Sequence, residues 1–323
     1  MFNIPPIIKE FRPELNGLRA LAVLLVLLYH LEFYWIGGGF LGVDIFLVIS
    51  GYFISKNILY DLQKGQFTFK RFYTKRLRRL FPALIFTLIV VLIAGYFILT
   101  PSNYERLGQS SFFAALSLSN FFFWQESGYF DLDAIGKPLL HMWSLSLEEQ
   151  FYLFWPVLLV TFHRFFRKYL FWIVVGFLLV SVLLAEYNYD IDSSANFFLI
   201  PFRMFEFLMG AACIWLERMR IFKTQFVKEF ILSAGLVIMI FMSVWTTNFT
   251  RMPGLYSLIP CAGAMMAIIG GQARISSRIL NNGIALLIGK ASYSIYLIHW
   301  PLIVFFRYWK IEEITLIDQL TLG

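Results

Sequence analysis

Arg19 and His30 are the residues of this chain whose types and spacing point most directly to chemistry. They lie eleven positions apart and enclose the apolar run Ala20–Tyr29. Eleven residues of α-helix make about three turns, so both side chains would lie on nearly one face, about 16 Å apart along the axis. Histidine exchanges protons near neutral pH and is the commonest general base. Two costly polar groups in one apolar segment predict a functional site, provided that the segment spans a membrane.

The composition is that of an integral membrane protein. Hydrophobic residues make up 59% of the 323 positions and charged residues 15%, whereas soluble domains average about 45–50% and 25%. The apolar residues fall in segments near the length of about 20 residues that a membrane helix needs. Ten segments are predicted: 15–35, 39–58, 79–100, 144–162, 170–186, 196–216, 229–247, 254–271, 284–307 and one that begins near residue 314. The sequence therefore predicts an all-α polytopic bundle of about ten transmembrane helices.

Two stretches depart from this pattern. Residues 110–124 are apolar but short, so we expect a re-entrant or interfacial segment there. The tenth segment reaches residue 323 after only a few apolar residues. We therefore expect residues 1–323 to form a single transmembrane domain whose last span is truncated.

The basic residues gather in alternate loops, and this predicts an orientation. Eight lysines and arginines lie from Lys56 to Arg79, around the loop between the second and third segments. Short loops rich in such residues favour the cytoplasmic side. The alternating scheme places the N-terminus in the cytoplasm, Arg19 toward the cytoplasm and His30 in the outer half of the membrane. The net charge of +7 reflects this loop bias, and we expect no nucleic-acid partner.

Acidic residues also lie inside the predicted spans. Asp44 lies near the outer start of the second segment, where it could balance the helix dipole or orient the His30 imidazole. In the fourth segment, Glu148 and Glu149 would point about 100° apart on a helix, so at most one lines a shared cavity well. We assign Glu148 to the cavity. The alternative is that Glu148 forms a buried ion pair with Arg203 or another cation.

Further polar residues could belong to the same cavity. His141 and Trp143 enter the fourth segment beside the two glutamates, and His299 lies in the ninth. A histidine that is simply satisfied within the packing is an equal alternative for His299. Arg203 and Glu206 lie three positions apart in PFRMFEFLMG, and a self-contained ion pair is the simpler interpretation of that spacing.

Arg76 and Arg79 lie three positions apart just before the third segment. A helical start would place both guanidinium groups on one face. Such a face suits a phosphate or pyrophosphate, because each guanidinium can donate two hydrogen bonds. The alternative is a positive anchor that contacts anionic lipid headgroups, and residue chemistry alone favours this alternative.

Other familiar sites are not indicated. Cys213 and Cys261 fall inside predicted spans without CxxC spacing, so we expect two buried small hydrophobic residues. The four histidines lack the spacing of a metal-ligand cluster, and no metal site is predicted. The chain also has no glycine-rich dinucleotide fingerprint and no phosphate loop ending in Gly-Lys-Ser/Thr.

Six segments follow one another along the chain: RPELNGLRALAVLLVLLYH, GGGFLGVDIFLVISGYFI, KRLRRLFPAL, PLLHMWSLSLEEQFYLFWP, PFRMFEFLMG and ASYSIYLIHWPL. In this order they resemble the integral-membrane acyltransferase-3 family, and within it the bacterial O-acetyltransferases of surface polysaccharides. The family's arginine and histidine fall on Arg19 and His30. Its cytoplasmic arginine pair falls on Arg76 and Arg79, and its Trp-Ser-Leu-x-x-Glu segment on 143–148.

The resemblance implies a reaction and a location. An acyl group, usually acetyl from cytosolic acetyl-CoA as co-substrate, would pass to a hydroxyl of an extracytoplasmic polysaccharide. Lipopolysaccharide O-antigen is the expected acceptor, and the bacterial cytoplasmic (inner) membrane is the expected location. The remaining partners would be membrane lipids.

The resemblance also implies roles for the polar residues inside the membrane. His30 would act as the general base on the sugar hydroxyl. Arg19 would line the donor passage or stabilise charge on the thioester, and Asp44 or Glu148 would orient the imidazole.

Two further sets of residues would contact the substrates. Arg76 and Arg79 would hold the phosphates of coenzyme A. Trp143, His141 and His299 would line the substrate cavity.

The sequence also leaves room for a second domain and for an alternative function. The PLLHMWSLSLEEQFY segment resembles members that carry an extra span and an SGNH-type esterase-like domain, so an extracytoplasmic domain could follow residue 323. The alternative function is a transporter or flippase of a glycan or acyl intermediate, because buried charges and histidines also mark transport paths. Inverted repeats would favour this alternative, and none is visible in the sequence.

Overall fold

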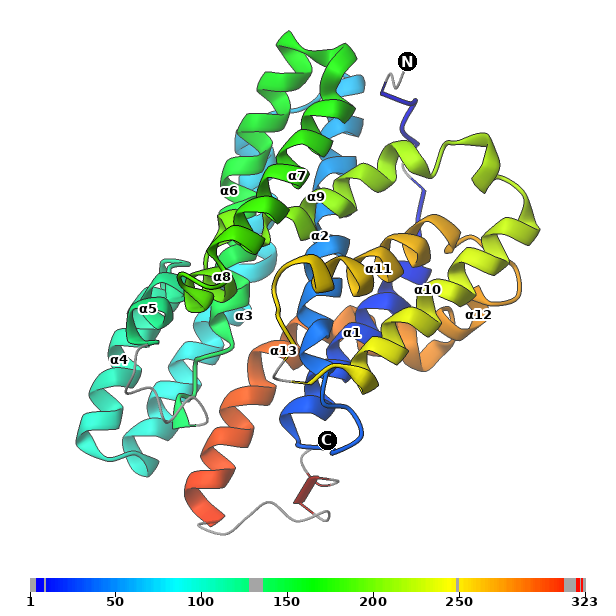
Figure 1. Ribbon diagram of the computed structural model, residues 1–323. Helices are drawn as coiled ribbons and strands as arrows, with labels where there is room; N and C mark the ends of the chain where they lie inside the picture. The colour runs from blue at the N-terminus through cyan, green and yellow to red at the C-terminus, as the bar shows by residue number, and fades with distance from the viewer. Residues whose placement is uncertain are drawn as a thin grey trace.

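Every regular element in the described part of the protein is a helix. A computed structural model describes residues 4–8, 10–127, 136–247, 250–310, 318, 319 and 321. The α-helices are α1 (Glu14–His30), α2 (Gly42–Gln63), α3 (Phe69–Ile98), α4 (Pro101–Ala115), α5 (Ser119–Glu126), α6 (Met142–Phe165), α7 (Leu170–Asn188), α8 (Ser193–Phe198), α9 (Ile200–Leu216), α10 (Gln225–Trp245), α11 (Leu258–Gly270), α12 (Ser277–Leu280) and α13 (Gly283–Lys310). Short 3-10 turns are η1 (Gly39–Leu41), η3 (Arg167–Tyr169), η4 (Arg220–Phe222) and η5 (Leu255–Ser257). The predicted all-α class is confirmed for this part of the chain (Figure 1).

Threonines fix the starts of three helices. Thr68, Thr100 and Thr224 each accept a hydrogen bond from the backbone N–H three residues later, at the beginning of α3, α4 and α10. An N-cap hydroxyl satisfies one of the donors that the first helical turn leaves without a partner. The cap at Thr68 begins the helix that carries Arg76 and Arg79 near its start.

Five helical segments are long and apolar enough to cross a membrane: Gly39–Gln63, Phe69–Ile98, Arg167–Asn188, Ser193–Leu216 and Gln225–Trp245. They coincide with five of the predicted spans. Helices α1, α6 and α13 also occupy predicted spans, but α1 has only 17 residues and the other two are more polar. Judged by length and composition, the described residues therefore contain fewer membrane-spanning helices than the ten that the sequence predicts.

Two predicted segments differ in detail. The segment 196–216 is interrupted at Leu199, which is extended, because Pro201 suits the first turn of a new helix and not a helix interior. The stretch 110–124 is divided between α4 and α5 by a turn at Ser117 (φ 58°). These helices have 15 and 8 residues, too few to cross a bilayer.

Two further predicted spans have different outcomes. The segment 254–271 forms a short apolar helical stretch, Leu255–Gly270. The span predicted to begin near 314 lies outside the described residues, apart from 318, 319 and 321.

Helices α2 and α9 approach each other backbone to backbone at two glycines. A Cβ atom at Gly51 would lie 1.8 Å from the carbonyl oxygen of Phe207, and one at Gly210 would lie 1.9 Å from that of Val48. Small residues allow this close approach between membrane helices. The crossing brings the first turns of the two helices together, and these turns carry Asp44 and Arg203.

Helix α1 packs chiefly against α13 and also against α2 (Figure 1). Its crossing with α13 is tight, because a Cβ atom at Gly289 would lie 1.8 Å from the carbonyl oxygen of Asn16. Helix α1 ends at His30 where α2, α6 and α9 begin, and we name this the His30 end of the bundle. The opposite end of the bundle contains Arg12, which lies two positions before α1, and we name it the Arg12 end.

Candidate active site

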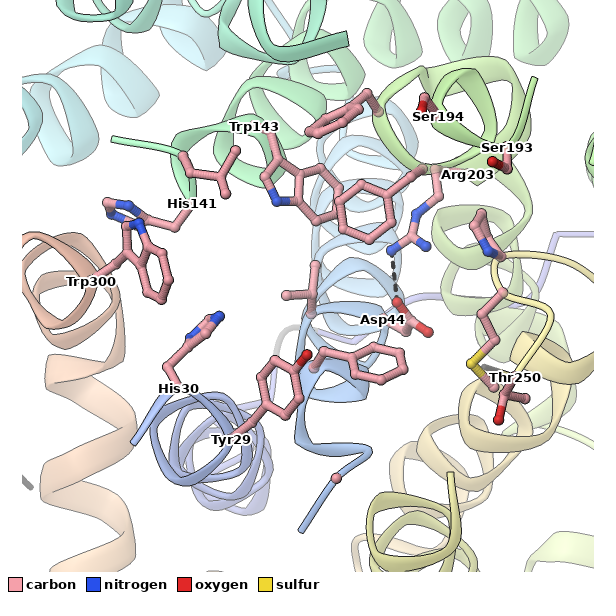
Figure 2. Close-up of a pocket in the computed structure, with 18 of the residues that line it drawn as sticks. Tyr29, His30, Asp44, His141, Trp143, Ser193, Ser194, Arg203, Thr250 and Trp300 are labelled. Carbon is pink, nitrogen blue, oxygen red and sulfur yellow. Dashed lines mark hydrogen bonds and ion pairs between the residues drawn. The ribbon is translucent and has the colours of Figure 1, made fainter. Parts of the chain in front are cut away.

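A cavity of about 780 Å³ lies at the His30 end of the bundle. Helices α1, α2, α6, α9 and α13 and the segment after α10 contribute to its walls. Its described lining includes Tyr29, His30, Asp44, His141, Trp143, Ser193, Ser194, Arg203, Thr250 and Trp300 (Figure 2). We name it the outer cavity.

His30 contacts another histidine in the wall of the outer cavity. Its Nδ1 atom lies 3.1 Å from Nε2 of His299. The indole of Trp300 also packs against His30, with ring centroids 4.7 Å apart. His30 is the last residue of α1, so its ring leaves the helix at the end where the backbone dipole stabilises positive charge.

The hydrogen bonds of His299 assign the tautomers of both rings. Nδ1 of His299 lies 2.7 Å from the carbonyl oxygen of Tyr296, so in a neutral ring this nitrogen must carry the proton. Nε2 of His299 is then an acceptor, and Nδ1–H of His30 donates to it. The remaining nitrogen of His30, Nε2, therefore holds the lone pair that a general base requires.

His141 belongs to the same group of rings. Its Nε2 lies 3.1 Å from the carbonyl oxygen of Leu297, and its ring centroid lies 5.3 Å from that of His299. Nδ1 of His141 has no hydrogen-bond partner among the described residues. The structure thus brings together three histidines that the sequence distributes over helices α1 and α13 and the residue before α6.

Asp44 pairs with Arg203 and not with His30. Its Oδ1 atom lies 2.7 Å from Nη2 of Arg203, and both side chains are buried. Of the two alternatives for Asp44, the structure supports a charge in the first turn of α2 and does not support an orienting bond to His30.

The predicted pair of Arg203 and Glu206 is present but is not self-contained. Nε of Arg203 lies 3.3 Å from Oε1 of Glu206, while Nη2 of the same guanidinium binds Asp44. A buried ion pair needs such additional partners, because isolated charges are costly in a low-dielectric interior.

Aromatic rings surround this ion pair. The guanidinium of Arg203 lies 5.5 Å from the ring of Trp143, whose ring centroid is 4.4 Å from that of Phe197. Trp143 is buried in the lining of the outer cavity, at the position expected for substrate contact.

A second, smaller cavity lies deeper in the bundle. It has a volume of about 40 Å³ and is lined by Arg19, Glu148, Ser144 and Tyr296, among others. Tyr296 and Val43 belong to the walls of both cavities, so the two adjoin. We name the smaller one the inner cavity. Arg19 therefore faces the interior of the bundle, together with Glu148.

Glu148 is hydrogen-bonded within α2 and α6 and does not contact His30. Its Oε1 atom accepts hydrogen bonds from Ser50 and Tyr152. The prediction that Glu148 orients the His30 imidazole is therefore wrong for this structure, in which His30 contacts His299 instead. The alternative pair of Glu148 with Arg203 is also not formed, since Arg203 binds Asp44 and Glu206.

Arg76 and Arg79 lie on α3 on the side of the inner cavity remote from His30. Arg76 is half-buried, with its guanidinium 4.7 Å from the ring of Tyr152, whereas Arg79 is exposed. The charges of both arginines act on Arg19, as does the charge of Glu148. The sequence-predicted positive residues thus form one electrostatic group that extends from the surface to the inner cavity.

Arg12 organises a separate buried cluster that the sequence analysis missed. Its guanidinium donates to Glu14, at 2.6 Å, to Tyr52, at 2.6 Å, and to Glu217, at 3.0 Å. Burial opposes the charged form, but Tyr52, Glu14 and Glu217 together raise the pKa of Arg12 above its ordinary value. Lys56 also reaches Glu217, at 3.2 Å. The cluster joins the segment before α1 to the middle of α2 and to Glu217, the residue that follows α9.

Several functional candidates carried only weak signals in the sequence. Tyr152 follows Glu148 by four positions, the spacing of neighbours on one helix face. Ser50 and Tyr296 have no comparable signal, because their partners lie far away in the sequence.

The cysteines are buried free thiols. Within the described ranges, no group of three histidine, cysteine or acidic side chains is arranged to hold a metal ion.

Comparisons with known proteins agree with this architecture. An acyltransferase domain model, Acyl_transf_3, matches residues 12–322. Peptidoglycan O-acetyltransferase OatA of Listeria monocytogenes serovar 1/2a is 34% identical over 310 residues, which cover 91% of this chain and 50% of the relative. O-acetyltransferase OatA of Staphylococcus aureus strain NCTC 8325 is 31% identical over 318 residues, which cover 94% and 52%.

The chain spans about half the length of these relatives. No solved structure matches it significantly. The match to the domain extends over nearly every residue described above and includes both cavities. The chain is therefore a membrane protein that belongs to the acyltransferase-3 family, and the acyltransferase domain of that family occupies nearly its whole length.

Proposed function

We propose that this protein transfers an acetyl group from acetyl-CoA to a hydroxyl of an extracytoplasmic glycan, with His30 as the general base. The observation that carries the proposal is the state of the His30 ring. Nδ1–H is bound to His299, so Nε2 is available to accept a proton beside the outer cavity. A correctly placed base of this kind contributes typically 10²–10⁴-fold to a rate.

The acceptor hydroxyl oxygen attacks the thioester carbonyl carbon while its proton moves to Nε2 of His30. The C–S bond then breaks, and the proton passes from His30 to the departing sulfur, which yields an acetyl ester and free coenzyme A. The carbonyl of Tyr296 and the ring of His299 hold the imidazole in place while it is charged.

The donor would enter from the end of the bundle opposite His30. Arg76 and Arg79 would bind the phosphates of coenzyme A, and Arg19 would line the passage for the slender pantetheine arm. The inner cavity supports this route. Arg19 and Glu148 line it, and it shares Tyr296 with the wall of the outer cavity. The charges of Arg76 and Arg79 act on Arg19 from the other side of the route. This arrangement makes the Arg12 end cytoplasmic, in agreement with the distribution of basic loops.

The names of the relatives favour peptidoglycan as the acceptor. One is described as a peptidoglycan O-acetyltransferase, whereas the sequence resemblance ranked lipopolysaccharide O-antigen first. We therefore place the acceptor among cell-wall glycans, with the protein in the bacterial cytoplasmic membrane and in contact with its lipids.

The dimensions of the cavities favour acyl transfer over transport of a glycan. The outer cavity of about 780 Å³ can hold a sugar-sized group, but the inner cavity has only about 40 Å³. A bound water needs about 10–15 Å³ on the same measure, so the inner cavity holds a few waters at most. A thin acyl-bearing arm requires far less widening of this passage than a sugar ring.

The test uses the purified full chain in lipid nanodiscs, acetyl-CoA labelled in the acetyl group, and soluble glycan fragments from peptidoglycan. We expect label to appear in the glycan as an alkali-labile ester. The variant His30→Ala should lose about 10²–10⁴-fold of this activity. Retention of full transfer by His30→Ala at equal protein amount would exclude His30 as the base.

A matched control is available in the same protein. His163 lies in the last turn of α6, outside both cavities, and His163→Ala should keep the wild-type rate. Movement of the glycan into vesicles without any acetylation would instead identify a transporter.

A further inference from the structure

The charged residues of the outer cavity occur as pairs. Glu32 and Arg307 are joined at 2.6 Å, and Asp44 and Arg203 at 2.7 Å. Apart from histidines, these four are the ionisable acidic and basic side chains among the described lining residues. No carboxylate or guanidinium in that described lining therefore lacks an opposite charge.

Paired charges have a consequence for the ligand. An anionic ligand that enters a buried site needs an uncompensated cation, because a buried charge without a partner is costly. Arg203 already has two carboxylate neighbours, Asp44 and Glu206. A further carboxylate or phosphate would have to displace one of them. A neutral hydroxyl, in contrast, can donate to Asp44 and accept from Arg203 without disturbing the pair.

The remaining lining suits a sugar ring. Trp143 and Tyr29 present aromatic surfaces, and Ser193, Ser194 and Thr250 present hydroxyl groups. Figure 2 shows His30 on one side of the cavity and the Asp44–Arg203 pair on the other, with Trp143 and Tyr29 bordering the space between them. Aromatic side chains combine a large apolar surface with defined geometry and can pack against the C–H face of a pyranose.

We propose that the outer cavity binds a neutral pyranose, with the Asp44–Arg203 pair hydrogen-bonded to two of its hydroxyls, so that a third hydroxyl faces His30. This inference rests on the proposed function, since it names the class of acceptor unit for the same site. The pair acts as a binding and specificity element and takes no part in the proton transfer. Any carboxylate or phosphate of the natural acceptor lies outside the cavity.

The experiment measures binding, which does not depend on turnover. The full chain in nanodiscs is titrated by isothermal calorimetry with chitotetraose, a neutral N-acetylglucosamine tetramer, and with an anionic tetrasaccharide of alternating N-acetylglucosamine and glucuronic acid. We expect chitotetraose to bind at least about tenfold more tightly than the anionic sugar. The anionic sugar would have to displace a carboxylate from Arg203, and the loss of one buried partner costs about this much. Its affinity should change little between low and high salt.

Two results would overturn the proposal: equal or tighter binding of the anionic sugar, or absence of chitotetraose binding at millimolar concentration. These results leave acetyl transfer to glycans open, because they concern only the chemistry of the subsite. Conversely, chitotetraose binding without any turnover of acetyl-CoA would retain the subsite and reject the proposed function.

Variants locate the site. Asp44→Asn keeps the shape of the side chain but removes the charge that faces the cavity, and it should weaken chitotetraose binding about tenfold. Glu206→Gln is the matched control, because Glu206 contacts the same guanidinium and is absent from the cavity lining. Equal effects of the two substitutions would contradict the assignment. If Asp44→Asn fails to fold, the comparison of the two sugars on the unaltered protein still decides.

Discussion

Nδ1 of His30 lies 3.1 Å from Nε2 of His299, although the two residues are 269 positions apart in the chain. The contact joins the last residue of α1 to α13, which cross tightly at Gly289. A carboxylate usually orients a catalytic histidine, but here a second imidazole is in that position. Its own Nδ1–H is held by the carbonyl of Tyr296, so the direction of the His30 hydrogen bond is determined by the backbone of α13.

The role of His299 can be tested with two substitutions. His299→Leu removes the acceptor for Nδ1–H of His30, and a buried donor without a partner costs roughly 1–3 kcal/mol. We expect kcat for acetyl transfer to fall about tenfold or more, with little change in the KM for acetyl-CoA. His299→Gln supplies an amide oxygen as acceptor and should retain more activity.

A pH–rate profile distinguishes this role from a packing effect. The profile should be displaced in His299→Leu and remain close to the wild-type profile in His299→Gln. Equal losses and equal profiles in the two variants would show that the hydrogen bond to His30 does not position the base.

The arginine pair on α3 gives a prediction about the donor. Replacement of both Arg76 and Arg79 by glutamine should raise the KM for acetyl-CoA about a hundredfold or more, because hydrogen bonds to charged groups contribute roughly 1.5–3 kcal/mol each and two guanidinium groups are lost. The value of kcat at saturation should change much less. Initial rates over a range of acetyl-CoA concentrations measure both.

Lys75 and Arg78 provide the matched control. They carry the same total charge, lie on the same helix with the same spacing of three, and are exposed. Their replacement by glutamine should leave the KM near the wild-type value. A similar increase in both double variants would return Arg76 and Arg79 to the role of a nonspecific positive anchor for lipids.

The crossing of α2 and α9 predicts a large effect of one methyl group. Gly51→Ala places a Cβ atom 1.8 Å from the backbone oxygen of Phe207, which cannot move away as a side chain does. Such overpacking typically costs about 1–3 kcal/mol. We expect a lower thermal unfolding temperature and weaker acetyl transfer, because the same crossing positions Asp44 beside Arg203.

Gly176 on α7 is the control for this substitution. A Cβ atom at Gly176 would meet nothing within 4 Å, and alanine is about 0.5–1 kcal/mol more favourable than glycine inside a helix. Gly176→Ala should therefore unfold at an unchanged or slightly higher temperature. A comparable loss of stability in both variants would contradict the backbone clash as the cause.

The cluster at the Arg12 end predicts a stability difference between two arginines. Arg12→Gln leaves the buried carboxylate of Glu14 without its cation, and breaking such a pair costs about 3–5 kcal/mol. Arg106→Gln breaks the ion pair with Glu126, in which Arg106 is 57% exposed, and should cost about 0–1 kcal/mol. Thermal unfolding in nanodiscs measures both, and equal shifts would refute the difference.

The pKa of Arg12 adds a condition to this test. Because its neighbours raise the pKa of Arg12 above the ordinary value, its stabilising contribution is fully present at every pH below the ordinary arginine pKa. It is lost only when the pH rises toward the higher value in the folded state. Arg12 therefore stays charged across the neutral pH range, and its ionisation should not change the difference in unfolding free energy between the wild type and Arg12→Gln.

Much of the helical fold could be predicted, because a helix that enters a membrane needs a long apolar segment, and such segments are visible in the sequence. Apolar length marks the helices, and the described helices fall on nine of the predicted segments with shifted ends. The exceptions have local causes that the apolar count ignores. Pro201 begins a new helix after Leu199, and Ser117 adopts a positive φ between α4 and α5.

The sequence by itself determined that the chain is helical, that it is built for a membrane, and that Arg19, His30, Glu148 and the Arg76–Arg79 pair are its unusual polar residues. These are properties of residue type and of spacing within one segment, where the helix period alone relates the side chains. Partners on different helices are another matter. Only the tertiary structure decided that His299, and not Asp44 or Glu148, contacts His30, and that Asp44 pairs with Arg203. Those choices depend on crossings such as those at Gly51 and Gly289, because where two backbones can approach each other determines which distant side chains meet.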